Sequence, residues 1–150
     1  MNTLIVYATH SGSTYCVASE IMGIFGGKYP TLIKRADETD NADVDSSDVI
    51  LIGSSSWDYK GKRGYPLRDM MNFLEKLKGS DLSGKKIIVF GCGDSDYEYF
   101  CGAVDVIEEK LSEIGSKPTF QSLKINRFFL DELQNRDQVK KWAKEALNSL

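Results

Sequence analysis

Hydroxyl groups dominate a short segment near the N-terminus. Residues 9–14, Thr-His-Ser-Gly-Ser-Thr, carry hydroxyls at four of six positions, one glycine, and no lysine or arginine. Backbone N–H groups at the start of a helix, helped by hydroxyl donors, can hold a phosphate dianion without a cation. A P-loop would need a lysine before its final Ser or Thr, so ATP hydrolysis is disfavoured. Taken alone, the segment suits a phosphate site and a simple helix N-cap equally well.

Aromatic residues mark a second segment, where a turn would ordinarily be polar. Trp57 and Tyr59 follow three serines in residues 54–59, Ser-Ser-Ser-Trp-Asp-Tyr. A large ring at the end of a strand offers a stacking face to a flat ligand, and filling the core is the alternative interpretation.

The third segment is residues 91–101, Gly-Cys-Gly-Asp-Ser-Asp-Tyr-Glu-Tyr-Phe-Cys. The dinucleotide fingerprint GxGxxG fails here, because its third glycine would fall at Asp96. The segment presents backbone amides, two tyrosines and three carboxylates, and carboxylates would repel a pyrophosphate. We therefore expect it to face the uncharged end of a ligand. A phosphate cradle together with aromatic segments indicates a mononucleotide with a large planar head.

The elements that position these segments alternate between apolar runs and helical patterns. Apolar runs predict strands at residues 3–8, 31–34, 49–52, 87–90 and 119–125, and helical spacing predicts helices at 14–25, 67–77, 104–114 and 139–147. Residues 37–48 and 53–64 are expected to be polar loops. This alternation predicts one α/β domain over residues 1–150, with a doubly wound, five-stranded parallel sheet in the order 2-1-3-4-5. In such sheets ligands bind beyond the carboxyl ends of the strands, where all three segments fall.

Composition excludes several other classes of function. The net charge of −3 argues against nucleic acid as a partner, and no apolar run approaches the roughly 20 residues of a membrane span. The N-terminus lacks the basic region of a secretory signal, so we expect a cytoplasmic protein. Cys16, Cys92 and Cys101 are expected to be reduced thiols, and a single histidine, His10, excludes a metal site that needs two imidazoles.

The same segments resemble the flavodoxin family. Residues 5–14, IVYATHSGST, are similar to its phosphate loop, and residues 91–105, GCGDSDYEYFCGAVD, resemble the flavin-ring loop of short-chain members. Only some 20 residues separate Lys117 from Asp137, which leaves no room for the extra loop of long-chain members. The resemblance implies a flavodoxin-like fold and non-covalently bound FMN.

The resemblance also implies a role for particular residues. Residues 9–14 would bind the phosphate, Trp57 would stack on the inner face of the flavin ring and Tyr97 on its outer face. Amides near Asp94 and Cys101, and the Tyr99 carbonyl, would hydrogen-bond the pyrimidine edge. The residues expected to contact the cofactor are Thr9, His10, Ser11, Gly12, Ser13, Thr14, Ser55, Ser56, Trp57, Asp58, Tyr59, Cys92, Gly93, Asp94, Tyr97, Tyr99, Phe100 and Cys101.

The chain departs from the family pattern at several positions. His10 stands where relatives carry a small or hydroxyl residue, and a solvent-facing histidine is favoured there over one that titrates with the phosphate. Asp58 occupies a place in the turn after Trp57 where many relatives carry glycine. The positive charges of Lys60, Lys62, Arg63 and Arg68 lie beside a site that is typically acidic.

The expected function is a low-potential one-electron carrier, not an enzyme, that moves electrons between a reductase and client redox proteins as a monomer with transient partners. Stacked rings and nearby carboxylates would lower the potential at which the flavin accepts its second electron. Two alternatives stay open. One is a flavoprotein of the same fold dedicated to activating a single metalloenzyme, and the other is a phosphate-dependent enzyme or regulator without flavin.

Overall fold

The computed structural model describes residues 1–150. Strands and helices alternate along most of the chain. In order they are β1 (Thr3–Ala8), α1 (Ser13–Phe25), β2 (Thr31–Arg35), the short 3-10 helix η1 (Ala36–Glu38), α2 (Asn41–Asp45), β3 (Val49–Tyr59), β4 (Lys62–Pro66), α3 (Arg68–Leu77), β5 (Lys86–Gly93), α4 (Gly102–Glu113), β6 (Leu123–Asn126) and α5 (Glu132–Asn148).

Five of the six strands form the predicted parallel sheet. Their order is β2-β1-β3-β5-β6, which is the expected 2-1-3-4-5 once β4 is set aside. The doubly wound α/β architecture is therefore confirmed. The order reverses between β1 and β3, so the loops that follow these strands diverge and leave space for a ligand.

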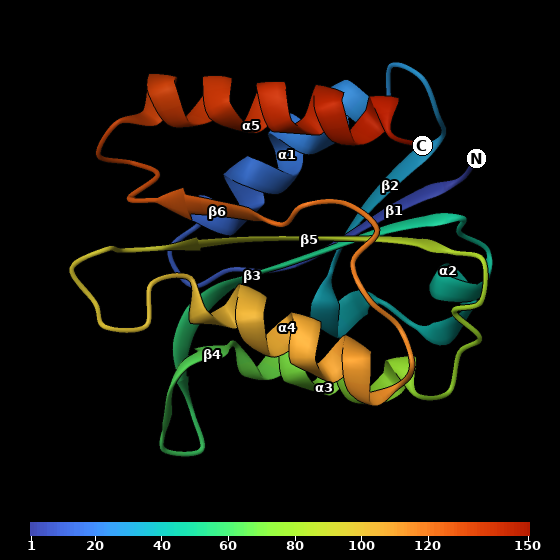
Figure 1. The fold of residues 1–150 in the computed structure, drawn as a ribbon, viewed down its shortest axis with the longest axis horizontal. Coiled ribbons are helices and arrows are strands. Elements are labelled where there is room, and N and C mark those ends of the chain that lie inside the picture. Colours follow the sequence, from blue (N-terminus) through green and yellow to red (C-terminus); the bar gives the residue numbers. More distant parts are fainter.

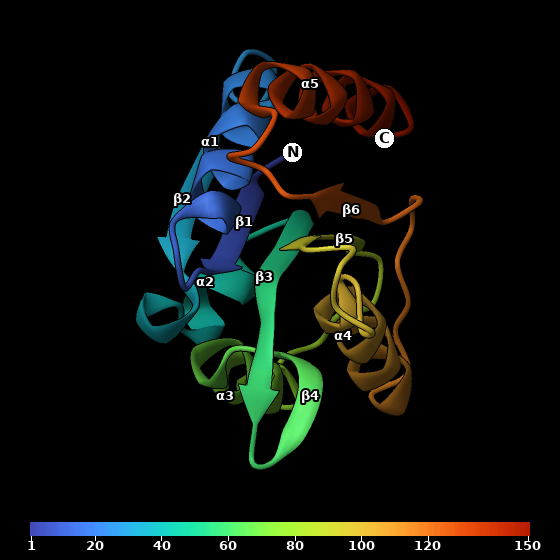
Figure 2. The same cartoon turned by 90° about the vertical axis from the view of Figure 1, so that its left-hand side faces the viewer.

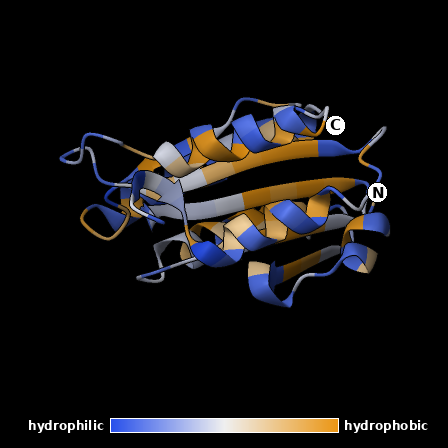
Figure 3. Ribbon diagram, turned by 90° about the horizontal axis from the view of Figure 1, so that it is seen from below, coloured by the Kyte–Doolittle hydropathy of each residue, from blue (hydrophilic) through white to orange (hydrophobic).

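Helices cover both faces of the sheet, as Figure 1 shows, with α1 and α5 on one side and α3 and α4 on the other. Successive residues of β1 and β3 point to opposite faces, and each face meets its own apolar cluster. Leu4 and Val6 face α3 and α4, whereas Ile5 faces α1 and α5. Figure 3 shows the resulting apolar strands between helices that combine polar and apolar residues. This double burial explains why the central strands are apolar without alternation.

The sixth strand, β4, was not predicted. β3 continues through Ser54–Ser56 to Tyr59, and β4 pairs antiparallel with its outer half, where Trp57 lies opposite Tyr65. Of residues 53–64, expected to be a polar loop, the first three continue the parallel sheet and the rest form a hairpin that projects from the body (Figure 2). Two serines anchor it, because Ser54 Oγ accepts the Leu67 N–H at 3.1 Å and Ser56 Oγ accepts the Ala103 N–H at 3.0 Å.

The turn of this hairpin corrects the expectation for Asp58. Asp58 lies within β3 beside an irregularity in register, and its φ is not positive. The turn instead falls at Lys60 and Gly61, whose φ values are 50° and 76°. Asp58 is therefore free of left-handed backbone strain, and a lysine carries that strain in its place.

Smaller differences concern residues that look like loops in the sequence. Within residues 37–48 the chain forms α2, which begins with a capping box between Asp40 and Asp43. The last strand is confined to Leu123–Asn126, and α5 begins at Glu132, seven residues before the predicted helix. None of the helices has the length and apolar character needed to cross a membrane.

Candidate functional site

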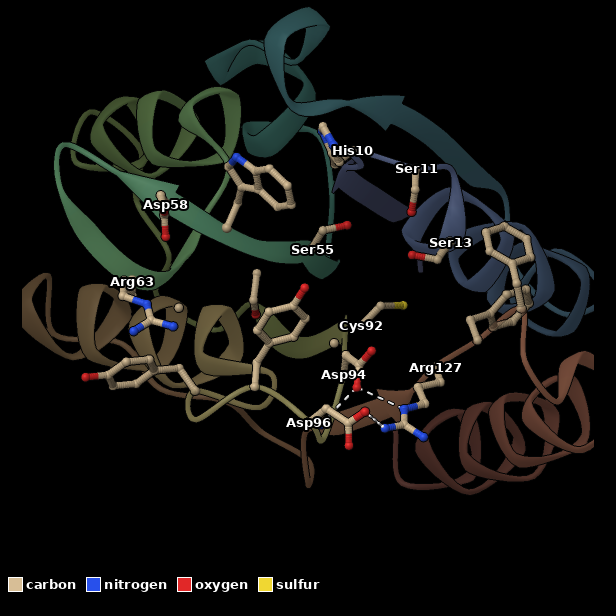
Figure 4. Close-up of a pocket in the computed structure, with 18 of the residues that line it drawn as sticks. His10, Ser11, Ser13, Ser55, Asp58, Arg63, Cys92, Asp94, Asp96 and Arg127 are labelled. Atoms are coloured by element: carbon tan, nitrogen blue, oxygen red, sulfur yellow. Dashed lines mark hydrogen bonds and ion pairs between the residues drawn. The ribbon is translucent and has the colours of Figure 1, made fainter.

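A cleft of about 630 Å³ opens at the carboxyl ends of β1, β3 and β5. Four segments form its walls: the loop after β1, the end of β3 with its hairpin, the loop after β5, and the loop after β6. The lining residues are His10, Ser11, Ser13, Ser55, Ser56, Trp57, Asp58, Arg63, Gly64, Cys92, Gly93, Asp94, Asp96, Tyr97, Tyr99, Arg127, Phe128, Phe129 and Leu130. Figure 4 shows Ser11, Ser13 and Ser55 together on one side of this space, with Asp58 and Arg63 on another.

The loop after β1 leads directly into the N-terminus of α1. Gly12 caps this helix in the left-handed conformation, with φ 96°, and no side chain fills the cap. Thr9 Oγ1 accepts the Gly12 N–H at 2.9 Å and so fixes the loop. Ser11 and Ser13 line the cleft, whereas Thr14 is buried and shares a 2.7 Å hydrogen bond with the Ser55 hydroxyl. The arrangement leaves unsatisfied helix N–H groups and two hydroxyls facing the cleft, which suits a dianion.

His10 is exposed, as expected, and it also has a neighbour. Its ring stacks on the Trp57 indole with centroids 4.2 Å apart and 27° between the planes. The contact joins the phosphate-loop side of the cleft to the hairpin side. His10 is therefore a packing partner of the indole as well as a surface residue.

Four aromatic side chains that line the cleft are exposed, namely Trp57, Tyr97, Tyr99 and Phe129. Trp57, on β3, is 53% exposed, and Tyr97, in the loop after β5, is 65% exposed. Burial of rings of this size contributes strongly to stability, so leaving both in solvent indicates a surface that a ligand covers. Tyr59, by contrast, lies outside the cleft, where its ring stacks on Tyr65 at 6.3 Å and packs against the core.

The loop after β5 divides its residues between the cleft and the interior. Gly93, Asp94, Tyr97 and Tyr99 line the cleft, while Phe100 packs against the core. Cys101 is fully buried, has a left-handed φ of 49° and caps α4. The structure thus leaves Thr9, Gly12, Thr14, Tyr59, Phe100 and Cys101 behind the walls of the cleft and brings the other predicted site residues to its surface.

The thiols near the cleft are protonated. Cys92 lies on the floor of the cleft, where burial raises its pKa to about 11, and burial raises the pKa of Cys101 to about 12. A thiolate is the nucleophilic form of cysteine, so neither residue supplies a nucleophile near neutral pH.

Arg127 is a site residue that the sequence did not reveal. It follows β6, and its Nε donates to Asp94 Oδ1 at 2.9 Å while a second guanidinium nitrogen contacts Asp96 (Figure 4). The Asp96 N–H and Arg127 together hold the pKa of Asp94 below its usual value, and the two carboxylates raise that of Arg127. Asp94 and Asp96, two of the nearby carboxylates expected to repel negative charge on the flavin, are therefore paired. The feature of the sequence that could have indicated this residue is a cation directly after the last strand of the doubly wound sheet.

Residues 128–130 also reach the cleft. Phe128 is buried and covers the core, but Phe129 and Leu130 are 52% and 75% exposed. Arg63 and Gly64 enter the wall because β4 returns alongside the loop after β5. A Cβ at Gly102 would lie 2.4 Å from the Gly64 carbonyl oxygen, so glycine there lets the hairpin and α4 meet.

Fold and cleft define an α/β protein with a nucleotide-sized site at the reversal of its strand order. The sequence model of the flavodoxin family matches residues 5–142. A flavodoxin of Maridesulfovibrio salexigens is 39% identical over 94% of this chain and 93% of its own length. The structure of oxidised flavodoxin 2 from Bacillus cereus has a TM-score of 0.83 and 31% identity, with 95% of each chain covered. A Fusobacterium nucleatum flavodoxin bound to flavin mononucleotide has a TM-score of 0.82 at 15% identity, covering 99% of this chain and 98% of its own.

The chain belongs to the flavodoxin family. Membership confirms the expected class of function, an electron carrier whose cofactor is FMN. The site described above fits this cofactor, since an uncapped helix N-terminus with two hydroxyls suits a phosphate and two half-exposed rings suit a flat heterocycle.

Proposed function

We propose that this cleft holds FMN with its phosphate at residues 9–14 and its ring beside Trp57 and Tyr97, and that the protein carries single electrons between a reductase and client redox proteins. One observation carries the proposal. A cation-free helix N-terminus lies at one side of a cleft whose other walls present exposed aromatic rings.

The phosphate side is selective by charge and geometry. Ser11 and Ser13 supply hydroxyl donors, and the hydrogen bond from the Gly12 N–H to Thr9 Oγ1 fixes the conformation of the loop. Pre-organised N–H donors at a helix N-terminus favour a dianion over a neutral group. The Thr14–Ser55 hydrogen bond fixes this loop to β3, and thereby to the ring side of the cleft.

The ring side orients the flavin and keeps water from its faces. FMN, when bound, supplies the one-electron chemistry. Trp57 and Tyr97 stack on the ring, and the backbone of Gly93 and Asp94 offers donors to its polar edge. Asp58 lies exposed in the same wall, where its negative charge opposes reduction of the ring.

The protein acts as a carrier and not as an enzyme under this proposal. The thiol on the cleft floor is held protonated by burial, and His10 packs on the Trp57 ring. The free cysteines suit the reducing interior of the cell. We further propose that residues 1–150 act as one FMN-binding domain and as a monomer with transient partners.

The test compares FMN with riboflavin, which lacks the phosphate. Affinities are measured from the quenching of flavin fluorescence on binding. The protein is expected to bind FMN much more tightly than riboflavin. Ser11→Ala/Ser13→Ala should weaken FMN binding by about 1–2 kcal/mol, the order of two hydrogen bonds, and leave riboflavin binding unchanged. Ser112→Ala, an exposed serine at the far end of α4, is the control. Equal affinity of the unaltered protein for both ligands would contradict the phosphate site.

A further inference from the structure

The β3–β4 hairpin carries a group of exposed cations beside the cleft, Lys60, Lys62 and Arg63. None of the three forms an ion pair, although 11 ion-pair contacts are present elsewhere in the molecule. Asp58 on the hairpin itself and Glu98 in the loop after β5 form no ion pair, and Glu75 on α3, whose charge is coupled to that of Lys60, pairs instead with Lys78 at 2.8 Å. The hairpin therefore presents uncompensated positive charge on a protein whose net charge is −3.

Aromatic rings support these cations. Lys60 Nζ lies 5.3 Å from the centroid of the Tyr59 ring, Lys62 Nζ lies 5.4 Å from that of Tyr65, and Arg63 Cζ lies 5.8 Å from that of Tyr99. Contacts of this kind are weakly favourable at exposed sites. Unlike a carboxylate partner, a ring limits the motion of a cation and leaves its charge in place.

The turn itself favours another residue at position 60. Lys60 and Gly61 both have positive φ, which is the signature of a type I′ hairpin turn. Asn-Gly and Asp-Gly are the preferred pairs for this turn, because short polar side chains tolerate the left-handed region better than lysine does. The structure thus holds a cation at the tip where asparagine would strain the backbone less, and a strained residue of this kind points to a function.

The hairpin is fixed relative to the cleft. Gly64 packs against Tyr99 and Gly102 so closely that a Cβ at either glycine would meet an atom within 2.5 Å. The Ser56 bond to the Ala103 N–H adds a second attachment to α4. Figure 2 shows the hairpin extending beyond the sheet, and its residues Trp57, Asp58, Arg63 and Gly64 line the cleft. A partner that approaches the cleft therefore meets this positive charge.

We propose that the β3–β4 hairpin is a docking arm for a redox protein whose cofactor lies beside a cluster of Asp and Glu side chains. The inference rests on the proposed function, since it names the chemistry of the electron-transfer partner. Complementary charge raises the rate of encounter and orients the two proteins. Phe129 and Leu130, exposed in the opposite wall of the cleft, supply apolar surface for the same partner.

The experiment uses two electron acceptors that share the same haem but carry opposite surface charge. Reduced, FMN-loaded protein is mixed in a stopped-flow instrument with cytochrome c, whose haem edge is ringed by lysines, or with succinylated cytochrome c, in which those lysines carry carboxylates. The rate of haem reduction is followed as ionic strength rises. With the succinylated form, the rate is expected to fall as salt increases, because salt screens attraction.

Two charge-reversed variants locate the attraction. Lys60→Glu/Lys62→Glu should lower the low-salt rate with succinylated cytochrome c about tenfold or more, the lower end of electrostatic steering, and should invert its salt dependence. Lys141→Glu/Lys144→Glu alters two exposed, unpaired lysines of α5 on the far side of the sheet and changes the net charge equally. This control is expected to keep a rate that falls with salt.

Three outcomes would overturn the proposal. The first is a rate with succinylated cytochrome c that rises with salt in the unaltered protein. The second is an equal change of this rate in both double variants. The third is binding of the unaltered protein to single-stranded DNA that Lys60→Glu/Lys62→Glu abolishes. FMN affinity and the flavin absorbance are measured on every variant. Failure of the unaltered protein to bind FMN would refute the proposed function. Normal FMN binding, together with a salt dependence that Lys60→Glu/Lys62→Glu leaves unchanged, would refute only the docking arm.

Discussion

On one edge of the cleft Arg127 contacts both Asp94 and Asp96, whereas on the other edge Lys60 and Lys62 contact only tyrosine rings. In the first arrangement the charges neutralise one another, and the ion pairs join the loop after β5 to the loop after β6. The second leaves them available to solvent, where their field extends over roughly a Debye length, about 8–10 Å at physiological salt. Charge on the carboxylate edge thus maintains the shape of the site, and charge on the hairpin edge acts on what approaches it.

The two edges of the cleft should contribute similarly to FMN binding through their stacked aromatic rings. Trp57→Ala and Tyr97→Ala remove one exposed ring from each edge, and each is expected to weaken FMN binding by about 1–3 kcal/mol, the range for one stacked aromatic. Dissociation constants from fluorescence quenching measure the effect. Tyr29→Ala, between α1 and β2 at the opposite end of the sheet, should leave FMN affinity unchanged. An unchanged affinity in either cleft variant would assign that ring to packing alone.

The junction between the edges can be broken by a single methyl group. Gly102→Ala places a Cβ 2.4 Å from the Gly64 carbonyl oxygen and should destabilise the protein by about 1–3 kcal/mol, as overpacking does. Gly23→Ala in α1 meets nothing within 4 Å and should stabilise it by about 0.5–1 kcal/mol through helix propensity. Urea unfolding of the FMN-free protein measures both. A neutral Gly102→Ala would mean that the hairpin moves away from α4 at little cost.

The smallest expected effect concerns pH. The Asp96 N–H and Arg127 lower the pKa of Asp94 in the folded state, so the stability they contribute is fully present above the unfolded pKa of about 3.9 and is lost as pH falls through the lower folded value. Arg127→Gln should therefore be less stable than the unaltered protein at pH 5–7, by an amount that shrinks below pH 4. Solvent screens this partly exposed pair, so the difference is small.

Lys62→Gln is the counterpart on the hairpin edge, because it removes a cation without a carboxylate partner. Its stability difference from the unaltered protein is expected to stay constant over the same pH range in urea titrations. A difference that shrinks below pH 4 in both variants would show that the two edges do not differ in the way their charges are paired.

Much of the fold could be read from local pattern. Strands buried on both faces leave continuous apolar runs, as at residues 49–52 and 87–90, and the order of a doubly wound sheet restricts their arrangement. The same reasoning placed the three chemical segments at one edge of the sheet. Most of their residues line the cleft in the structure, because the carboxyl ends of parallel strands lie at the same edge of the sheet.

The hairpin and Arg127 escaped prediction for different physical reasons. β3 extends beyond its apolar run because β5 pairs with Ser54 and Ser55 and β4 pairs with Ser56–Tyr59, although the sequence of this stretch is typical of a loop. Arg127 pairs with residues 31 and 33 positions away, and no local periodicity reports an ion pair of that separation. The capping box of Asp40 and Asp43, by contrast, was visible in the acidic stretch that was interpreted as a loop.

The Lys60–Gly61 turn also has a consequence for mutation. Lysine and asparagine codons differ only in their third base, so the residue that would relieve this turn lies one substitution away. Backbone stability and electron delivery then favour opposite alleles at a single site. Lineages that no longer need the carrier are expected to drift toward asparagine at position 60, whereas lineages that depend on it should retain a cation, and sequencing of serially passaged populations would reveal which pressure governs.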